Sequence, residues 1–173
     1  MKRLRFLLLD ANVVIKLFEF GLWSKAIEKC EFWIAETVIG ETEFFFNAEG
    51  QNAIDLSADI AAGRVTKFVV PADQIAKFQD QFRPDYLDRI DPGEAESLAY
   101  LMTSTDACLL CSGDSIVFRI LGRMGRGEQG ISLEEVLQQI GFTAAISSQY
   151  RRDFRDRWTK RGQQDMVQTI GLK

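Results

Sequence analysis

The sequence predicts an α/β fold in three layers, helix, sheet and helix, with a central and mostly parallel sheet. Short apolar runs alternate along the chain with segments in which apolar residues recur at helical spacing. The run over 6–9 is apolar at every position, which is typical of a strand buried on both faces. Acidic side chains follow two of these runs, as Asp10 and Asp114. In a parallel sheet such positions lie at the carboxyl ends of the strands, where ligands bind.

The composition is that of a folded protein of one domain's size. The chain has 173 residues, of which 46% are hydrophobic and 27% charged, so we expect a real core and no extended disorder. Its apolar runs fall far short of the roughly 18 to 20 residues that span a bilayer, and the apolar stretch near the start ends at Asp10. We therefore expect a cytoplasmic protein that does not enter a membrane.

The first half of the chain begins with a predicted strand over 3–9, followed by a helix. Asn12 is the expected N-cap of this helix, because its side chain can accept a hydrogen bond from the first turn, and Gly21 ends it. A short strand is expected over 32–35. Apolar residues at helical spacing then predict helices over 37–47 and 53–62.

The second half continues the alternation. An apolar run before Pro71 predicts a strand over 65–70, and helical spacing predicts a helix over 72–82. Asp91 and Glu94 form a capping box with Pro92 at the first helical position, so a helix is expected over 91–102. The remaining elements are a strand over 107–111, a helix over 115–121, and a helix over 132–140 that opens with a second capping box.

The chain contains no histidine, which removes several classes of mechanism. Ser-His-Asp and Cys-His catalysis, His-ligated zinc and the HExxH proteases are excluded. Three cysteines are too few for a disulfide framework, and Cys108 and Cys111, although at CxxC spacing, lie in an apolar run and are expected in the core. Any chemistry must therefore rely on carboxylates and on a hard metal that carboxylates bind.

Residues 125–130 match the glycine pattern GxGxxG of dinucleotide-binding sites. That pattern works between a strand and a helix, whereas here it follows a predicted helix in a charged loop. We expect a loop there and no nucleotide site.

Asp10 and Asp114 are expected to meet at the carboxyl edge of the sheet. Carboxylates that converge repel one another unless they are protonated or neutralised, and a divalent cation neutralises them. The alternative for Asp10 is a helix-capping role. For Glu94 the capping box is an alternative to a metal site, and Glu96 points to another side of the same helix. Periodicity alone leaves Glu41 as either a site residue or a solvated surface residue.

The end of the chain differs from the rest in charge. Residues 150–173 carry a net charge of +4, and the residues before them carry −8. Tyr150, Phe154 and Trp158 recur every four residues and predict an aromatic stripe along a helix. The chain is accordingly divided into 1–145 and a basic aromatic helical extension over 146–173. The arginines in this extension are expected either to be solvated or to contact RNA phosphates, and the candidates are Arg151, Arg152 and Arg155.

The order of the acids resembles that of the PIN domain family. The motifs are LLLDAN with Asp10 and Asn12, TVIGE with Glu41, DPGEAE with Glu94 and Glu96, and SGD with Ser112 and Asp114. The resemblance covers residues 4–141 and includes the closing segment ISLEEVLQQIG. The TVxxE spacing selects Glu41 and not Glu43, and GEAE is typical of members with an extra carboxylate.

This resemblance implies a three-layer α/β/α fold and a cluster of acids that binds Mg²⁺ or Mn²⁺. It also implies a metal-dependent endoribonuclease that hydrolyses RNA phosphodiester bonds, often a VapC-like toxin with an antitoxin partner, and a homodimer. The implied catalytic residues are Asp10, Glu41, Glu94 and Asp114. The implied metal ligands are Asp10, Glu94, Glu96 and Asp114, with Asn12 and Ser112 as supporting groups.

Two alternatives stay open. A PIN-like module without catalytic activity would keep the fold and bind RNA or a protein. A receiver-like signalling domain would need adjacent acids on the first strand and a lysine late in the sheet, and we find neither in the sequence.

Overall fold

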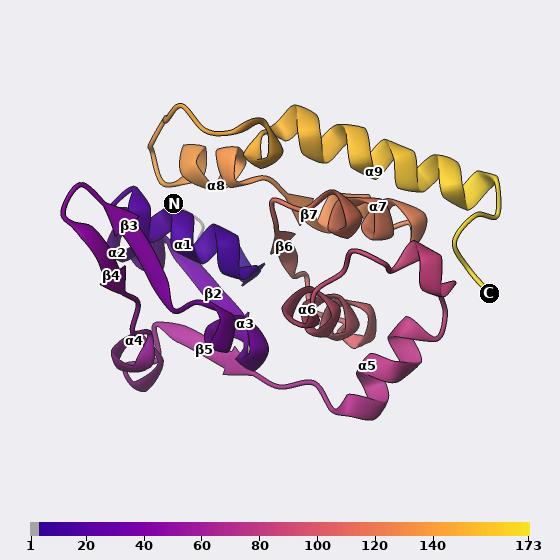
Figure 1. Cartoon of the computed structure of the whole chain (residues 1–173), viewed down its shortest axis with the longest axis horizontal. Coiled ribbons are helices and arrows are strands. Elements are labelled where there is room, and N and C mark those ends of the chain that lie inside the picture. Colours follow the sequence, from indigo (N-terminus) through magenta and orange to yellow (C-terminus); the bar gives the residue numbers. More distant parts are fainter. Residues whose placement is uncertain (1–3) are drawn as a thin grey trace.

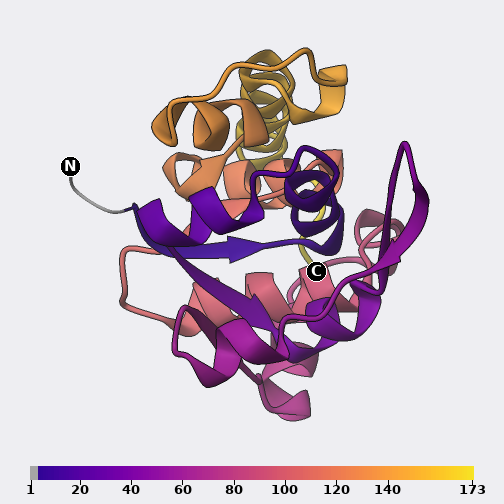
Figure 2. The same ribbon diagram turned by 90° about the vertical axis from the view of Figure 1, so that its left-hand side faces the viewer.

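A computed structural model describes residues 4–173. In this part of the chain, a parallel five-stranded sheet has the order β5 (Val65–Phe68), β2 (Cys30–Ala35), β1 (Leu4–Leu9), β6 (Leu109–Cys111), β7 (Gly130–Ile131) (Figure 1). Figure 2 shows helices on both sides of β1, so the sheet is the middle layer. The predicted α/β class and the parallel sheet are confirmed. Arg3, the expected start of the first strand, lies outside the described residues.

The helices alternate with the strands as expected. They are α1 (Ala11–Glu19), α2 (Trp23–Lys29), α3 (Glu36–Glu41), α4 (Ser57–Ala61), α5 (Ala72–Gln79), α6 (Pro92–Thr103), α7 (Ser115–Arg123), α8 (Leu133–Gln139) and α9 (Arg152–Val167). Three short 3₁₀ turns join them, namely η1 (Pro84–Tyr86), η2 (Gly127–Gln129) and η3 (Ser148–Tyr150). The helices predicted over 72–82, 91–102, 115–121 and 132–140 are confirmed, with small shifts of their ends.

Local hydrogen bonds explain where several helices begin and end. Both predicted capping boxes are present, Asp91 with Glu94 at the start of α6 and Ser132 with Glu135 at the start of α8. Gly141 follows α8 with a φ of 77°, a backbone conformation that glycine adopts without strain. These features fix the elements on either side of the sheet.

The prediction that Asn12 caps the first helix is wrong. Asp10 Oδ1 accepts a hydrogen bond from the Val13 N–H at 3.0 Å, so Asp10 is the N-cap of α1 and Asn12 is an exposed residue of its first turn. Asp10 has extended backbone directly after β1, whereas Asn12 is already helical. An N-cap residue needs the extended conformation, which decides between the two side chains.

The helix predicted over 37–47 is also wrong beyond Glu41, and the helix predicted over 53–62 is shorter than expected. An antiparallel hairpin of β3 (Phe44–Asn47) and β4 (Gly50–Ala53) follows α3, and it projects from the body in Figure 2. Three consecutive aromatic residues favour an extended backbone. Asn47 Oδ1 accepts from the Glu49 N–H at 2.9 Å in the turn, and Gly50 has a φ of 116°.

The C-terminal helix α9 packs along α7 in an unusually close contact (Figure 1). A Cβ atom on Gly162 would collide with the backbone of Arg119, and one on Gly122 would collide with the backbone of Thr159. Phe154 meets Phe118 edge to face, with ring centroids 6.4 Å apart, so the aromatic side of the predicted helix does face the core. The two glycines thus let the helix backbones approach more closely than larger residues permit.

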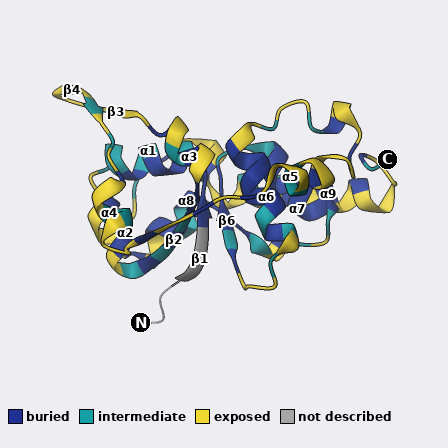
Figure 3. Ribbon diagram, turned by 90° about the horizontal axis from the view of Figure 1, so that it is seen from below, coloured by how far each residue is buried: buried dark blue, intermediate teal, exposed yellow. Residues whose placement is uncertain are grey.

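A buried carboxylate, Asp165, ties α9 to the rest of the fold. Its Oδ2 accepts from Arg119 Nε at 2.5 Å and from the Tyr86 hydroxyl at 2.8 Å. Asp165 has no exposed side-chain surface, and Arg119 also lies over the Tyr86 ring, 4.6 Å from its centroid. We call these three residues the Asp165 network. Figure 3 shows the burial of α6 and α7 near this region and the exposure of the β3–β4 hairpin.

The CxxC spacing, the GxGxxG pattern and the expected absence of a membrane helix remain to be compared with the structure. Cys108 and Cys111 are buried free thiols, as expected for core residues. The GxGxxG residues connect α7 to β7 through η2, so the strand and helix that a dinucleotide site requires do not flank them. Within residues 4–173, no helix combines the length and the apolar character that crossing a membrane requires.

Candidate functional site

The predicted acids lie at the point where the strand order of the sheet reverses. The chain proceeds outward from β1 through β2 to β5, and then returns to place β6 on the other side of β1. Asp10 directly follows β1, and Ser112 directly follows β6, its parallel neighbour. The carboxyl ends of two strands at such a switch point form a crevice, which is the usual ligand site of open α/β sheets.

Hydrogen bonds join the ends of β1 and β6 to the start of α6. Asp10 Oδ2 accepts from the Gly113 N–H at 3.1 Å, and the Ser112 hydroxyl lies 3.4 Å from Glu94 Oε1 as a donor. Ser112 Oγ also accepts from the Asp114 N–H at 2.9 Å. Asp10, Glu94 and the backbone of Asp114 therefore contact residues 112–113, and the charges of Asp10 and Asp114 act on Glu94. We call these three carboxylates the acid site.

Each aspartate of the acid site also begins a helix. Asp10 caps α1, and Asp114 caps α7 by accepting from the Ile116 N–H at 3.0 Å. Glu94 lies in the first turn of α6 and accepts weakly from the Asp91 N–H at 3.4 Å. Capping and a functional role are thus not exclusive here, because the helix starts themselves deliver the carboxylates to one place.

Burial and mutual repulsion disfavour negative charge in the acid site. Burial, together with the neighbouring carboxylates Asp91, Asp114 and Asp10, raises the pKa of Glu94 to about 9. Burial likewise raises the pKa of Asp10, although hydrogen bonds from Ser112, Val13 and Gly113 oppose the shift. Asp10 and Glu94 are only 5% and 4% exposed. Among the described residues, no arginine or lysine is one of the main causes of these two pKa shifts.

Glu41 reaches the rim of the acid site. It ends α3, and a Cβ atom on Gly93 would lie 3.0 Å from Glu41 Oε2 and 2.7 Å from a methyl group of Val38. The absence of a side chain at Gly93 therefore lets α3 approach the first turn of α6. Burial raises the pKa of Glu41, and the charges of Asp91 and Asp10 add to the shift. The selection of Glu41 rather than Glu43 agrees with this placement.

Glu96 is not brought together with the acid site. Its Oε2 accepts from the Thr37 hydroxyl at 2.5 Å, and its Oε1 accepts from the Val70 N–H at 2.8 Å. The side chain is 2% exposed, and these two bonds engage both carboxylate oxygens. Glu96 anchors α6 to α3 and to the end of β5, which corrects the expectation of a metal ligand there.

Two residues near the acid site were not among the predicted site residues. Asp91 contributes to the raised pKa values of Asp10, Glu41 and Glu94, so its charge belongs to the same local field. The sequence predicts Asp91 as a helix cap. It is the N-cap of α6, as Asp10 and Asp114 are the N-caps of α1 and α7, and it borders the acid site. Tyr150 packs against Gly113, and Asp10 adds to the burial that raises the pKa of Tyr150. No pattern in the sequence indicated that the extension reaches Gly113.

The arginines expected to contact RNA are partly engaged within the protein. Glu135 Oε1 pairs with Arg152 Nε at 3.2 Å and with Arg155 at 2.9 Å. Arg151 Nε donates to the Ile146 carbonyl at 3.2 Å. The pairs with Glu135 hold the extension on α8, and Ile146 and Tyr150 belong to the same hydrophobic core as the sheet. RNA contact by the three arginines stays a prediction.

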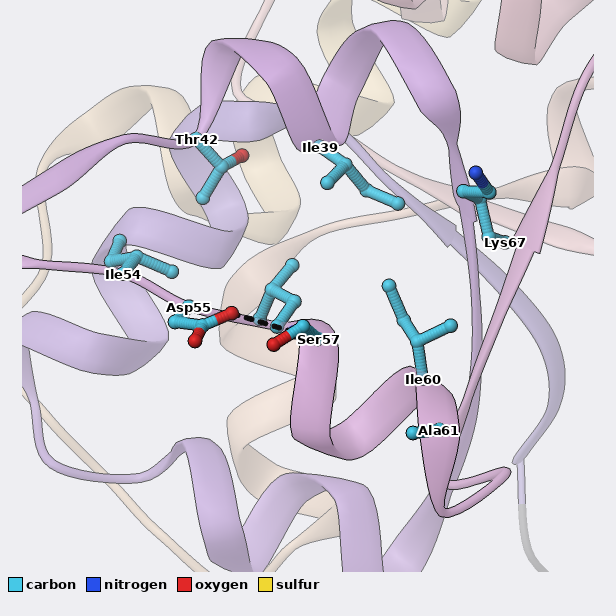
Figure 4. A pocket seen from close by; sticks show the side chains of 9 residues that line it. Ile39, Thr42, Ile54, Asp55, Ser57, Ile60, Ala61 and Lys67 are labelled. Atoms are coloured by element: carbon cyan, nitrogen blue, oxygen red, sulfur yellow. Dashed lines mark hydrogen bonds between the residues drawn. The ribbon is translucent and has the colours of Figure 1, made fainter.

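The acid donors do not yet form a ready cation site. As the side chains of residues 4–173 stand, no three or more Asp, Glu, Cys or His groups are arranged to hold a metal ion. A separate cavity of about 390 Å³ lies beneath the hairpin, lined largely by Ile39, Ile54, Leu56 and Ile60 (Figure 4). At its edge the Ser57 N–H donates to Asp55 Oδ1 at 2.9 Å. No member of the acid site lines this cavity.

No family model, curated protein or solved structure matches the chain. The similarity to PIN domains therefore stays a prediction from the order of the motifs.

Proposed function

We propose that this protein is a divalent-metal-dependent endoribonuclease of the PIN type that acts at the acid site. The observation that carries the proposal is the meeting of Asp10, Glu94 and Asp114 around Ser112 at the switch point of the sheet. Three motifs far apart in the sequence supply these groups, and the raised pKa of Glu94 shows that their charges act on one another. Strongly shifted carboxylates in a crevice are typical of functional sites. The RNA substrate comes from the resemblance alone.

The donor atoms fit Mg²⁺ or Mn²⁺ in chemical type. Carboxylate and hydroxyl oxygens are the ligands that hard divalent cations prefer, and the acid site has no histidine or thiolate that would select a softer metal. Asp10, Glu94 and Asp114 would hold the ion, with Glu41 at the rim. When bound, such an ion supplies positive charge that activates water and offsets the charge that develops on the phosphate.

The residues of the chain itself have distinct tasks in this proposal. The Val13 and Gly113 N–H groups fix the Asp10 carboxylate, and the Ser112 hydroxyl orients Glu94. Glu94, with its pKa near 9, keeps a proton at neutral pH while no cation is present. Asn12, exposed in the first turn of α1 two residues after Asp10, is proposed to contact substrate at the mouth of the site. Glu96 has no part, because its oxygens are engaged elsewhere.

The decisive experiment is cleavage of labelled single-stranded RNA with Mn²⁺ or with EDTA. Asp10→Asn is the test variant, because asparagine also caps helices well and the fold is expected to persist. We expect cleavage that requires the metal and falls by at least about 100-fold in Asp10→Asn, as for a group acting directly in catalysis. Glu43→Gln, an exposed neighbour of Glu41, is the matched control and should cleave like the wild type. Equal cleavage by Asp10→Asn would refute the assignment of the acid site.

The basic extension gives the proposal a second test. RNA retention should weaken as the salt concentration rises if Arg151, Arg152 or Arg155 contacts phosphates. Retention that does not change with ionic strength would show that these arginines only hold α9 in place. A toxin role with an antitoxin partner, and a homodimer, rest on the resemblance and would be examined by co-purification and by sedimentation.

One observation favours a second function, a PIN-like module that binds RNA or a protein without cleaving. The described side chains, as they stand, form no arrangement of three acids that could hold a metal. A non-catalytic module would cleave no RNA and would show no change of melting temperature with Mn²⁺. An endoribonuclease should cleave RNA, and Mn²⁺ should raise its melting temperature.

A further inference from the structure

A polar cavity of about 320 Å³ lies at the first turn of α7, the helix whose N-cap is Asp114 of the acid site. Its walls come from the loop after η1, with Asp88 and Arg89, from the first turns of α7, with Ser115 and Arg119, and from Trp158 on α9. Ser115 directly follows Asp114, and Arg89 stands two residues before Asp91. The volume lies at the lower end of the range for small-molecule pockets, roughly 300 to 1,000 Å³. The cavity is thus linked to the acid site through Asp114 and Asp91, which lie next to two of its lining segments in the chain.

One wall of the cavity is fixed by the Asp165 network. Arg119 is held by its ion pair with Asp165 and by its position over the Tyr86 ring, so its charge is already compensated. Tyr86 is held in turn by its hydrogen bond to Asp165. The cavity is thus preorganised, which lowers the entropic cost of binding a ligand.

The opposite wall offers polar groups that the protein does not use. Asp88 and Arg89 are exposed, and among the described residues neither forms a hydrogen bond or an ion pair. Asp85, also on this wall, is paired with Arg83 at 3.1 Å. One free carboxylate and one free guanidinium balance in charge, so the cavity presents both acceptors and donors without favouring an anion.

The remaining wall is aromatic. Trp158 is half-buried, and its ring lies against Phe154 with centroids 6.3 Å apart, which supports it from one side. A flat and neutral ligand that stacks on an indole and carries both donors and acceptors on its edge is a nucleobase. Among the RNA bases, guanine has two adjacent N–H donors on its Watson–Crick edge, which one carboxylate can accept together.

We propose that this cavity binds one base of the RNA strand beside the cleaved bond, with Trp158 stacking on it and Asp88 selecting guanine. Arg89, a donor next to Asp88, would meet the acceptor atoms of the same base. The inference rests on the proposed function for its substrate, and it makes the helical extension part of the substrate site. An endoribonuclease with such a pocket cuts next to guanine.

The first test measures binding without catalysis. GMP, AMP, CMP and UMP are titrated by calorimetry into the full chain in EDTA, so that neither metal nor cleavage enters. GMP is expected to bind at least about tenfold more tightly than UMP, and Asp88→Asn should remove that difference. Trp158→Ala should weaken GMP binding at least about fivefold, the lower bound for loss of one base stack. Trp158→Phe keeps an aromatic ring and should retain most of the GMP binding. It replaces Trp158→Ala as the test variant if Trp158→Ala does not fold.

Controls separate the two proposals. Asp73→Asn, which changes an exposed carboxylate on α5 outside the cavity, should bind GMP like the wild type. Equal or absent binding of all four nucleotides by the wild type, or an unchanged preference in Asp88→Asn, would overturn the pocket. Selective binding of GMP without any RNA cleavage would refute the proposed nuclease activity and support the proposed base-binding pocket. Where RNA is cleaved, mapping the cut sites should show that the wild type prefers guanine beside the cut and that Asp88→Asn does not.

Discussion

Buried carboxylates occur in two regions of the molecule, and their surroundings are opposite. In the Asp165 network a single carboxylate accepts from Arg119 and Tyr86, and Arg161 approaches its other oxygen at 3.5 Å. Burial acts to raise the pKa of Asp165, but the hydrogen bonds from Arg119 and Tyr86 outweigh it and lower the pKa. In the acid site, burial and neighbouring carboxylates both raise the pKa of Glu94.

This contrast distinguishes a structural role from the functional role proposed for the acid site. A buried charge with a cation and hydrogen bonds contributes to holding elements together, and removing one partner is costly. A group of buried carboxylates without a neighbouring cation destabilises the folded state, and such groups are concentrated at functional sites. The same residue type therefore has different meanings in the two regions, and the experiments below test that difference.

The largest effect is expected from removing the compensated carboxylate. Asp165→Ala leaves Arg119 and Tyr86 without their shared acceptor and should lower the free energy of unfolding by about 3 to 5 kcal/mol. Chemical denaturation measures the loss. Asp153→Ala, at an exposed position on the same helix, should stay within about 0.5 kcal/mol of the wild type. Similar losses in both variants would mean that the Asp165 network does not hold α9.

A smaller loss is expected where α9 meets α7. Gly162→Ala places a Cβ atom against the backbone of Arg119 and should cost about 1 to 3 kcal/mol of unfolding free energy by overpacking. Gly40→Ala in α3 meets no atom within 4 Å and should instead stabilise by up to about 1 kcal/mol, because alanine is the better helix former. If both glycine variants are stabilised, the close helix contact is not as described.

The acid site should respond in the opposite sense to the Asp165 network. Glu94→Gln removes a carboxyl group whose ionisation is disfavoured, and we expect the metal-free protein at pH 8 to gain at least about 1 kcal/mol, the equivalent of one pKa unit. The gain should be measured by denaturation in EDTA. Glu96→Gln, whose carboxylate is fully hydrogen-bonded, should lose stability under the same conditions. A loss in Glu94→Gln as well would place Glu94 among structural residues.

The pH dependence of stability gives a further comparison of the two regions. The folded pKa of Glu94, about 9, lies above its ordinary value of 4.5, so stability without metal should rise as the pH falls from 9 toward 4.5. The pKa of Asp165 is lowered from 3.8, so its contribution should disappear as the pH falls below that value. Melting temperatures of the wild type and of Asp165→Asn check both. Asp165→Asn should lack the acidic loss and keep the alkaline one.

The sequence was sufficient for the parts of the fold that local patterns determine. The uniform apolar run before Asp10 and the capping boxes at Asp91 and Ser132 locate β1, α6 and α8, because each depends on neighbouring residues. The acids after β1 and β6 could be placed together because parallel strands end at one edge. Phe44, Phe45 and Phe46 were misassigned to a helix, since apolar periodicity cannot separate a short strand from a helix.

The rest depends on contacts between distant segments. Glu96 differs from Glu94 by two positions, and its role is decided by Thr37 and by the Val70 N–H, which no local pattern places beside it. Gly122 and Gly162 are unremarkable in the sequence, because their significance lies in which helix faces which. Tyr150 was read as the start of a helical stripe, and its place against Gly113 follows from the docking of the whole extension.

The helix starts at the acid site have an electrostatic consequence. α1, α6 and α7 all begin there, and the first turn of each carries N–H groups equivalent to roughly half a positive charge. The carboxylates thus face three macrodipoles whose positive ends converge on them. A phosphodiester approaching this place would meet a mixed field, not a purely negative one, which is what the proposed RNA substrate would require of a crevice built from acids.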